Sequence, residues 1–206
     1  MNKLYKNIHQ DIIDRCREGD EKAQFQMYKL YYKAMYSVSL RIVNDAMEAE
    51  DVMQEAFLSA FKKMHTYKGE VSFGAWLKKI VVNRSLDYLK KRKVQLEEID
   101  ERTTQIEDYQ MPTHEINAEV LKAAIQNLSD GYRVVLSLYL IEGYDHEEIS
   151  QILNISNSAS RTQLLRAKNK LREMLKGKEV FSYNKKQDER KRLHRRIDCR
   201  QFGCTE

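Results

Sequence analysis

The chain has 206 residues, of which 42% are hydrophobic and 33% charged, and this composition excludes a wholly disordered protein. Its single proline and seven glycines exclude sandwiches, barrels and collagen-like repeats, because those folds need frequent turn residues. The formal net charge of +5 is too small to identify a partner by itself. We therefore expect an all-α protein.

Cysteine usage and the lengths of the apolar stretches indicate the cellular setting. Cys16, Cys199 and Cys204 are too few for a disulfide framework. The first sixteen residues carry charges where a secretory signal needs an apolar core. The longest apolar stretch, residues 134–141, is far shorter than the roughly 18 residues of a membrane span. We expect a soluble, cytoplasmic protein with no membrane span.

The first half of the chain contains three long amphipathic segments. After Asp20, apolar residues recur at steps of three and four up to about residue 45, which predicts a helix. Its predicted apolar stripe is Ala23, Met27, Leu30, Tyr31, Ala34, Val38 and Ile42. Further helices are predicted over Ala46–His65 and from about Phe73 to Arg92. Because the stripes can face one another, we expect a helical bundle over residues 8–92.

An acidic segment and a second helical block follow. Residues 93–113 contain the only proline and no sustained period, so we interpret them as a linker. A second helical domain is expected over residues 114–176. Residues 177–206 lose the apolar period and are expected to form a charged, mobile tail.

The end of the second block has the pattern of a helix-turn-helix. Helices are expected over 116–127, 130–142, 145–153 and 156–176. Asp145 and Glu148 have the spacing of a capping box, Gly143 can end the preceding helix, and Ser156 can cap the last one. A short helix, a short turn and a long helix are typical of this DNA-binding motif.

Positive charge is concentrated in two of the predicted helices. Lysine and arginine exceed acidic residues by five over 66–92 and again by five over 161–176, whereas 93–113 and 114–160 carry −4 and −5. Clustered cations are what phosphate binding requires, although each helix alone could be an ordinary solvated face. Two such helices favour nucleic-acid binding.

Two stretches carry a resemblance to a known family. Residues Glu48–Lys93, which include QEAF and GAWLKKIVVNRSLDYLKKRK, closely resemble region 2 of the extracytoplasmic-function (ECF) sigma factors of the sigma-70 family. Residues Leu128–Leu175, LSDGYRVVLSLYLIEGYDHEEISQILNISNSASRTQLLRAKNKLREML, look like its region 4. The resemblance covers about 20–92 and 115–176. It implies an alternative sigma factor, not an enzyme and with no cofactor, that binds core RNA polymerase and directs promoter recognition, promoter melting and transcription initiation.

The resemblance implies a polymerase-binding face. Asp51, Gln54 and Glu55 lie at i, i+3 and i+4 and so share one side of a helix. In the family this face docks on the β′ coiled coil, and part of region 4 packs on the β-flap. Anti-sigma factors are common partners of relatives. A metal site is disfavoured because no histidine joins these residues at ligand spacing.

Residues around the third helix are implied to bind the minus-ten element. Family members capture an unstacked base with the loop before this helix, here about residues 66–72. The implied contacts are Tyr67, Lys68, Lys78, Lys79, Asn83, Arg84 and Lys91. Phe73 is a further aromatic candidate at the loop, whereas Trp76 and Ile80 are expected to belong to the core.

The last helix is implied to read the minus-thirty-five element in the major groove. With Leu164, Ala167 and Leu171 turned inward, the outward residues would bind bases and phosphates. They are Arg161, Thr162, Leu165, Arg166, Lys168 and Asn169. Ser160 and Gln163 depart from the family's usual apolar and basic residues, so the promoter sequence cannot be transferred.

Other interpretations remain open. A helix-turn-helix regulator that acts without polymerase would share the second block, and an enzyme lacks any recognisable nucleophile or phosphate loop. His146, beside two glutamates, is expected to have a capping and surface role. His194, Cys199 and Cys204 have no common zinc spacing and are expected to be part of the tail.

Overall fold

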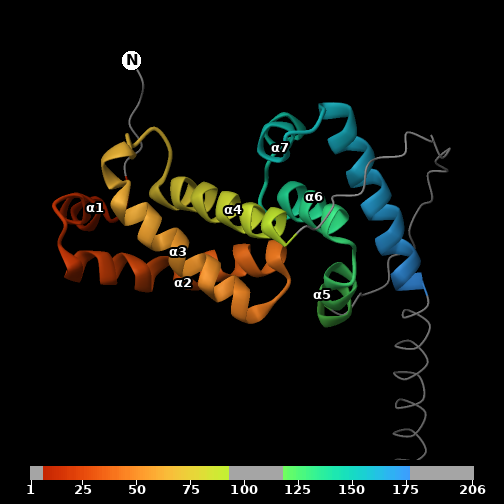
Figure 1. The fold of residues 1–206 in the computed structure, drawn as a ribbon, viewed down its shortest axis with the longest axis horizontal. Coiled ribbons are helices and arrows are strands. Elements are labelled where there is room, and N and C mark those ends of the chain that lie inside the picture. The colour runs from red at the N-terminus through yellow and green to blue at the C-terminus, as the bar shows by residue number, and fades with distance from the viewer. Residues whose placement is uncertain (1–6, 93–117, 177–206) are drawn as a thin grey trace, which may run out of the picture. The chain divides into compact units, whose positions relative to one another are not determined.

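The computed structural model describes residues 7–92 and 118–176, and both ranges consist of helices joined by short turns (Figure 1). The predicted all-α fold is confirmed over these ranges, and none of their helices is long and apolar enough to cross a membrane. The predicted linker and tail lie outside the described residues. The chain divides into two compact units, Met1–Ile99 with Ser129–Leu164, and Asp100–Leu128 with Leu165–Glu206.

The first unit begins with a short helix that the apolar pattern did not separate from the bundle. Helix α1, Gln10–Arg17, buries Ile13 and Cys16 and packs on the following helix. Its N-cap residue, His9, makes no side-chain cap hydrogen bond. The helix therefore lacks the strongest sequence signal for a helix start.

Two longer helices follow, and carboxylates cap both. Helix α2, Glu21–Val43, starts at Asp20, which accepts hydrogen bonds from the first-turn N–H groups at 2.8 and 3.2 Å. Helix α3, Ala46–Lys62, starts in the same way at Asp45. These bonds satisfy amide groups that have no partner within the helix. The starts of both helices agree with the predicted ones.

The third long helix of the first block is preceded by a turn and a loop. Helix α3 ends three residues before the predicted His65, and the 3-10 turn η1, Met64–Thr66, follows it. Helix α4, Phe73–Lys91, starts at Ser72, whose hydroxyl accepts from the N–H of Ala75 at 3.2 Å. The loop between η1 and α4 is therefore bounded by helical structure on both sides.

Helices α2, α3 and α4 pack against one another around an apolar core (Figure 1). Most of the predicted stripe of α2 is buried, but Leu30 and Ala34 are exposed, so their assignment to the core was wrong. In this part of the helix the core instead takes Met35 and Ser39, which the predicted stripe did not include. The fully buried large side chains of the three helices are Met27, Ile42, Met53, Phe73, Leu77, Val81 and Val82.

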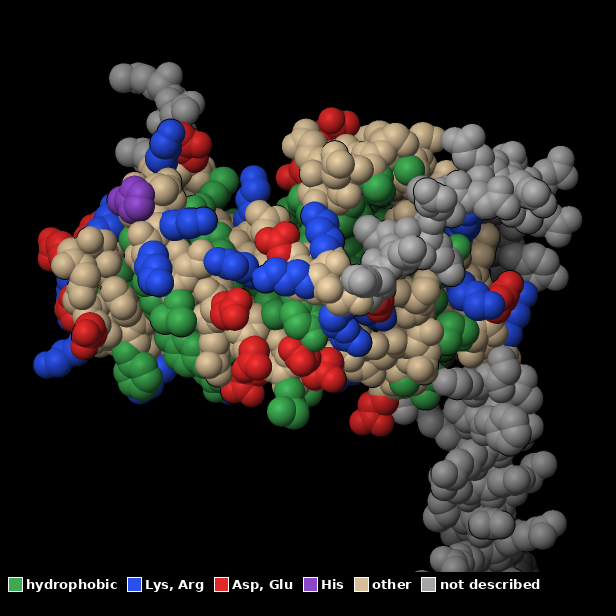
Figure 2. Space-filling view, in the orientation of Figure 1, with side chains coloured by type: hydrophobic (Ala, Val, Ile, Leu, Met, Phe, Trp, Pro, Cys, Tyr) green, Lys and Arg blue, Asp and Glu red, His purple; other side chains and the backbone are tan. Residues whose placement is uncertain are grey.

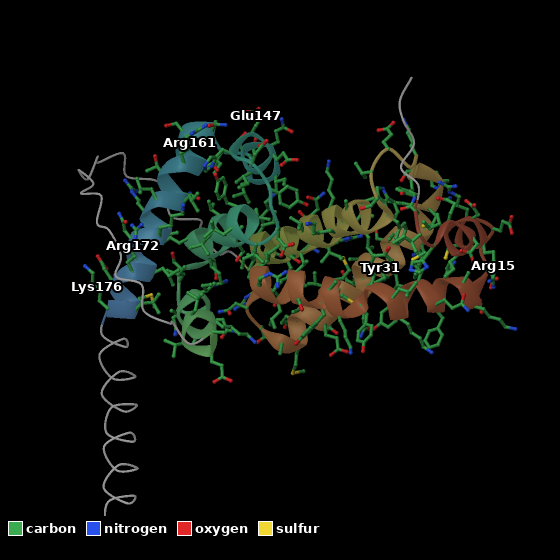
Figure 3. The ribbon with its side chains drawn as sticks, turned by 180° about the vertical axis from the view of Figure 1, so that it is seen from behind. Arg15, Tyr31, Glu147, Arg161, Arg172 and Lys176 are labelled. Atoms are coloured by element: carbon green, nitrogen blue, oxygen red, sulfur yellow. The ribbon has the colours of Figure 1, made fainter. Side chains whose placement is uncertain are left out.

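A close approach between α2 and α4 occurs at Gly74. A Cβ atom added there would lie 3.0 Å from Cε1 of Tyr31, a side chain labelled in Figure 3. The Tyr31 ring also packs edge-on against Phe73, with ring centroids 5.5 Å apart. Gly74 therefore leaves the space that this ring occupies.

The first unit also contains most of the helix-turn-helix. Helix α6, Asp130–Leu140, is followed by α7, His146–Leu153, and residues 157–164 begin the last helix. The predicted capping box is present: Asp145 and Glu148 exchange side-chain to backbone hydrogen bonds of 2.8 and 2.9 Å. The Ser156 hydroxyl accepts from the N–H of Ala159 at 3.0 Å, as expected for a cap.

The second unit contains, within its described residues, α5, Ala118–Gln126, and residues 165–176 of the last helix. Its fully or nearly buried residues are Ala124, Leu128, Ala167 and Leu175. Along the last helix, Asn169 accepts a hydrogen bond from Arg172 at 2.8 Å, and Lys170 pairs with Glu173 at 3.2 Å.

Candidate functional site

Helix α3 presents the residues expected to bind polymerase on one exposed face. Asp51, Gln54 and Glu55 are all exposed, while the opposite side of α3 faces the core. Figure 2 shows acidic side chains over the N-terminal part of α3 and basic side chains along α4. The arrangement suits a basic partner that reads carboxylate and amide groups at fixed spacing.

Two exposed apolar side chains extend this face and were missed in the sequence. Met47 lies four residues before Asp51 and is 81% exposed, and Leu58 lies three residues after Glu55 and is 62% exposed. The sequence could have indicated their exposure, because neither residue falls in the apolar stripe that α3 buries. Apolar groups beside charged ones are common at the centre of protein interfaces.

The loop before α4 is built around a buried tyrosine. Tyr67 is only 3% exposed, and its ring lies 5.6 Å from that of Phe73 and 5.3 Å from that of Trp76. This burial argues against the expected base-stacking role of Tyr67, because a ring inside the core has no free face. Lys68, Glu70 and Val71 are the exposed members of the loop beside it.

Loop geometry depends on a left-handed residue and on long-range contacts. Gly69 has φ of +75°, a conformation that side chains disfavour. The Tyr67 hydroxyl donates to the carbonyl of Val71 at 2.7 Å and accepts from Nδ2 of Asn7 at 2.9 Å. Arg17 donates to the carbonyl of Tyr67 at 2.7 Å. The first described residues of the chain therefore take part in shaping the loop.

Helix α4 carries the remaining residues expected at the minus-ten element. Most are exposed, namely Lys79, Asn83, Arg84 and Lys91. Trp76 and Ile80 are half-buried, and Phe73 is fully buried, so Phe73 belongs to the core. The exposed set lies on one side of the helix and is largely basic, although the exposed Asp87 lies among these residues.

Lys78 differs from its neighbours because it contacts the corner between α6 and α7. Its ammonium group lies 3.0 Å from the carbonyl of Glu142 and 3.6 Å from the Glu142 carboxylate. Arg41 donates to the same carboxylate through Nε at 2.9 Å. The Glu142 side chain is 6% exposed, so two cations compensate the cost of burying its charge.

Tyr144, in the same corner between α6 and α7, is kept in its protonated form by its surroundings. Burial, and then the negative charges of Glu142 and Glu148, raise the pKa of Tyr144 to about 12. Its ring lies 5.6 Å from the Lys78 ammonium group. A cleft of about 530 Å³ is lined by Tyr144 together with residues of the loop and of α4. Tyr144 therefore stays a neutral phenol at the edge of this cleft.

The helix-turn-helix is joined internally by a polar contact. Nδ1 of His146 lies 2.9 Å from the hydroxyl of Ser160, which is 0% exposed. The imidazole also stacks on Tyr139 with centroids 4.6 Å apart and planes at 26°. The expected surface role of His146 was therefore wrong: the ring is half-buried and links the helices. Ser160, which seemed a departure from the family pattern, is its partner.

Residues expected at the minus-thirty-five element lie on the last helix, whose labelled members include Arg161 and, nearer its described end, Arg172 (Figure 3). Arg161 is exposed and donates to Oδ1 of Asn157 at 2.8 Å. The others are half-buried: Thr162, Leu165, Arg166, Lys168 and Asn169. Leu164 and Ala167 are buried as predicted, and Leu171 is half-buried.

Potential metal ligands are dispersed over the described ranges. Among these residues, no three histidine, cysteine, aspartate or glutamate side chains gather as a metal site would require. The predicted tail residues His194, Cys199 and Cys204 lie outside these ranges. Burial and then the charge of Asp20 raise the pKa of Cys16 to about 11, so this thiol stays protonated at neutral pH.

Comparison with known proteins gives two family matches. Sigma-70 region 2 matches residues 27–94, and sigma-70 region 4 matches residues 118–171. The ECF RNA polymerase sigma factor SigM of Bacillus subtilis is 30% identical over 150 residues, covering 71% of this chain and 91% of SigM. The RNA polymerase sigma-H factor of Pseudomonas aeruginosa is 26% identical over 178 residues, covering 80% and 92%.

Solved structures agree at the level of the fold. The sigma factor RpoE of Bartonella quintana, in complex with the anti-sigma factor NepR, matches with a TM-score of 0.52 at 23% identity, covering 73% of this chain and 95% of that one. CnrH, in complex with the cytosolic domain of CnrY, matches with a TM-score of 0.50 at 22% identity, covering 81% and 96%.

Proposed function

Because the chain belongs to the ECF sigma factors of the sigma-70 family, we propose that three surfaces act together in promoter recognition. As an alternative sigma factor, the protein binds core RNA polymerase and directs it to promoters. The observation that carries this conclusion is the presence of both matched regions, in order, in one chain.

The first surface is the exposed face of α3, which docks on the polymerase β′ coiled coil. Asp51, Gln54 and Glu55 supply the polar contacts there. Their exposure supports this role, because a partner can reach all three side chains without opening the core. Charge reversal in Asp51→Lys should abolish co-purification with core polymerase. The matched control Glu18→Lys reverses an exposed acid on another element and should leave co-purification unchanged.

The second surface comprises the loop before α4 and the basic face of that helix. Lys68 and the α4 residues Lys78, Lys79, Asn83, Arg84 and Lys91 bind the minus-ten element, and Tyr67 supports the loop from inside. DNA must displace Glu142 to reach Lys78. Arg84→Ala should reduce permanganate reactivity of the minus-ten thymines, which reports promoter opening, at unchanged core binding.

The third surface is the last helix, which reads the minus-thirty-five element through Arg161, Thr162, Leu165, Arg166, Lys168 and Asn169. Exposure of Arg161 supports base or phosphate contact. A base contact predicts a loss of about 1–3 kcal/mol and relaxed specificity at one position for Arg161→Ala. A phosphate contact predicts instead a uniform loss and a salt slope smaller by about one.

Partners and setting follow from the same role. We place the protein in the cytoplasm with the polymerase, where it contributes binding rather than chemistry. Region 4 packs partly on the β-flap, and an anti-sigma factor controls access to the helical surfaces. The predicted region 2 bundle over 8–92, linker over 93–113 and region 4 domain over 114–176 are kept as its domain organisation.

In vitro transcription tests the proposal as a whole. Purified core polymerase should initiate from specific genomic fragments only when this chain is added. A regulator that acts without polymerase would bind duplex promoter DNA alone and would not co-purify with core. That result would replace the proposed function with the alternative one.

A further inference from the structure

We infer that Asn7 and Arg17 are positioning residues that hold the loop of residues 67–72 in the shape that receives an unpaired base of the minus-ten element. The inference rests on the proposed function of this loop. Neither side chain was singled out in the sequence, since both lie some fifty or more residues from the loop.

Asn7 ties the two ends of the loop together with one side chain. Its Nδ2 donates to the hydroxyl of Tyr67 at 2.9 Å, where the loop begins. Its Oδ1 accepts from the backbone N–H of Phe73 at 2.9 Å, where α4 begins. Phe73 N–H is one of the first amides of the helix and has no partner within it. The amide of Asn7 thus bridges both anchors.

Tyr67 links Asn7 to the rest of the loop through its hydroxyl group. Its hydroxyl accepts from Asn7 and donates to the carbonyl of Val71 at 2.7 Å. The buried ring is held between Phe73 and Trp76. Both hydrogen-bonding capacities of the phenol are therefore used, and the position of Val71 is fixed relative to α4.

Arg17 holds the loop from a second direction. Nη2 donates to the carbonyl of Tyr67 at 2.7 Å, and the guanidinium carbon lies 5.7 Å from the centre of the Tyr67 ring. Nη1 pairs with Asp14 at 2.9 Å, which orients the guanidinium group. Helix α1 therefore braces the loop independently of Asn7.

The contacts of Asn7 and Arg17 leave the outer side of the loop exposed, so that DNA can reach it. Lys68, Glu70 and Val71 are exposed, while Tyr67 is buried. A loop fixed before binding loses less conformational freedom when a base enters, which strengthens binding without adding any contact to DNA. Loss of either brace should therefore weaken capture of single-stranded DNA while leaving the polymerase-binding face of α3 intact.

The test uses full-length variants assembled with core polymerase. The probe is a labelled single-stranded oligonucleotide with the non-template minus-ten sequence of a promoter that the wild-type holoenzyme transcribes. Asn7→Ala and Arg17→Ala should each raise its Kd about tenfold, the effect of one lost charged or buried hydrogen bond. Core affinity should stay within about twofold, and Arg17→Lys should recover part of the loss.

Controls separate positioning from folding. Asp11→Asn changes an exposed residue of α1 and should behave as wild type. Tyr67→Phe removes only the hydroxyl that Asn7 contacts and should also weaken oligonucleotide binding. Unchanged oligonucleotide binding by Asn7→Ala, Arg17→Ala and Tyr67→Phe overturns the inference, as does a fall in core affinity equal to the fall in oligonucleotide affinity. A wild-type holoenzyme that does not bind the oligonucleotide overturns the proposed role of the loop instead.

Discussion

The buried contact between His146 and Ser160 gives a quantitative prediction about the helix-turn-helix. Ser160 is fully buried and lies 2.9 Å from Nδ1 of His146, whereas the imidazole is half-buried. Ser160→Ala removes the hydroxyl but lets the ring recover some contact with water. We therefore expect a cost of about 1 kcal/mol, near the mean for a hydrogen bond within a protein.

A double-mutant cycle isolates this interaction. His146→Ala alone also loses the stacking on Tyr139, which adds about 0.5–1.5 kcal/mol, but that loss cancels in the cycle. The coupling energy between His146→Ala and Ser160→Ala should be about 0.5–1.5 kcal/mol. Ser158, exposed on the same helix, supplies the control, and its coupling to His146 should be near zero.

Hydrogen exchange of the α7 amides is the suitable assay, because the chain has two units and one unfolding midpoint would mix them. Ser160→Ala should speed exchange of the protected amides about fivefold, the equivalent of 1 kcal/mol. A coupling no larger than that of the Ser158 control would refute the reasoning, and His146 and Ser160 would then be neighbours without an energetic link.

Three further predictions concern the first unit. Glu142→Gln should destabilise it by about 1–3 kcal/mol, less than for a wholly buried pair because both cations are partly exposed. The exposed Glu147→Gln should cost little, and hydrogen exchange of amides in the first unit compares the two variants. Phe73→Ala should cost about 3–5 kcal/mol, and Phe25→Ala, at an exposed position, under about 1; similar losses would contradict the assigned core. The Cys16 thiol has a pKa of about 11 when folded against an ordinary 9.0, so its contribution to stability should be complete below about pH 9 and lost as the pH rises toward 11. Cys16→Ser should flatten that part of the stability profile, and an unchanged profile would argue against the raised pKa.

Local signals in the sequence were sufficient for most helix boundaries. Asp20, Asp145 and Ser156 are side chains that cap helices by contacts within a few residues, so their effect can be read along the chain. Helix α1 lacks such a cap and was not separated from the bundle. The start of α1 could not be predicted because no capping hydrogen bond marks it in the sequence.

The site was predictable only where exposure follows from helical spacing. Asp51, Gln54 and Glu55 share one face because of the helix period alone. Tyr67 and Lys78 could not be placed in this way, since their surroundings come from distant parts of the chain. The hydrogen bonds that Tyr67 receives from Asn7 and Arg17 cross 60 and 50 residues, and the partner of Lys78 is 64 residues away. Such contacts have no local sequence signature.

The close approach of Tyr31 to Gly74 implies a constraint on how this sequence can drift. A methyl group at position 74 would need the ring at position 31 to move by a few tenths of an ångström or to be replaced by a smaller one. Alanine has a helix propensity about 1 kcal/mol more favourable than that of glycine. Helix propensity alone would therefore favour alanine at position 74. Homologous sequences should therefore carry paired changes: where alanine occupies the position equivalent to 74, the position equivalent to 31 should hold a smaller side chain.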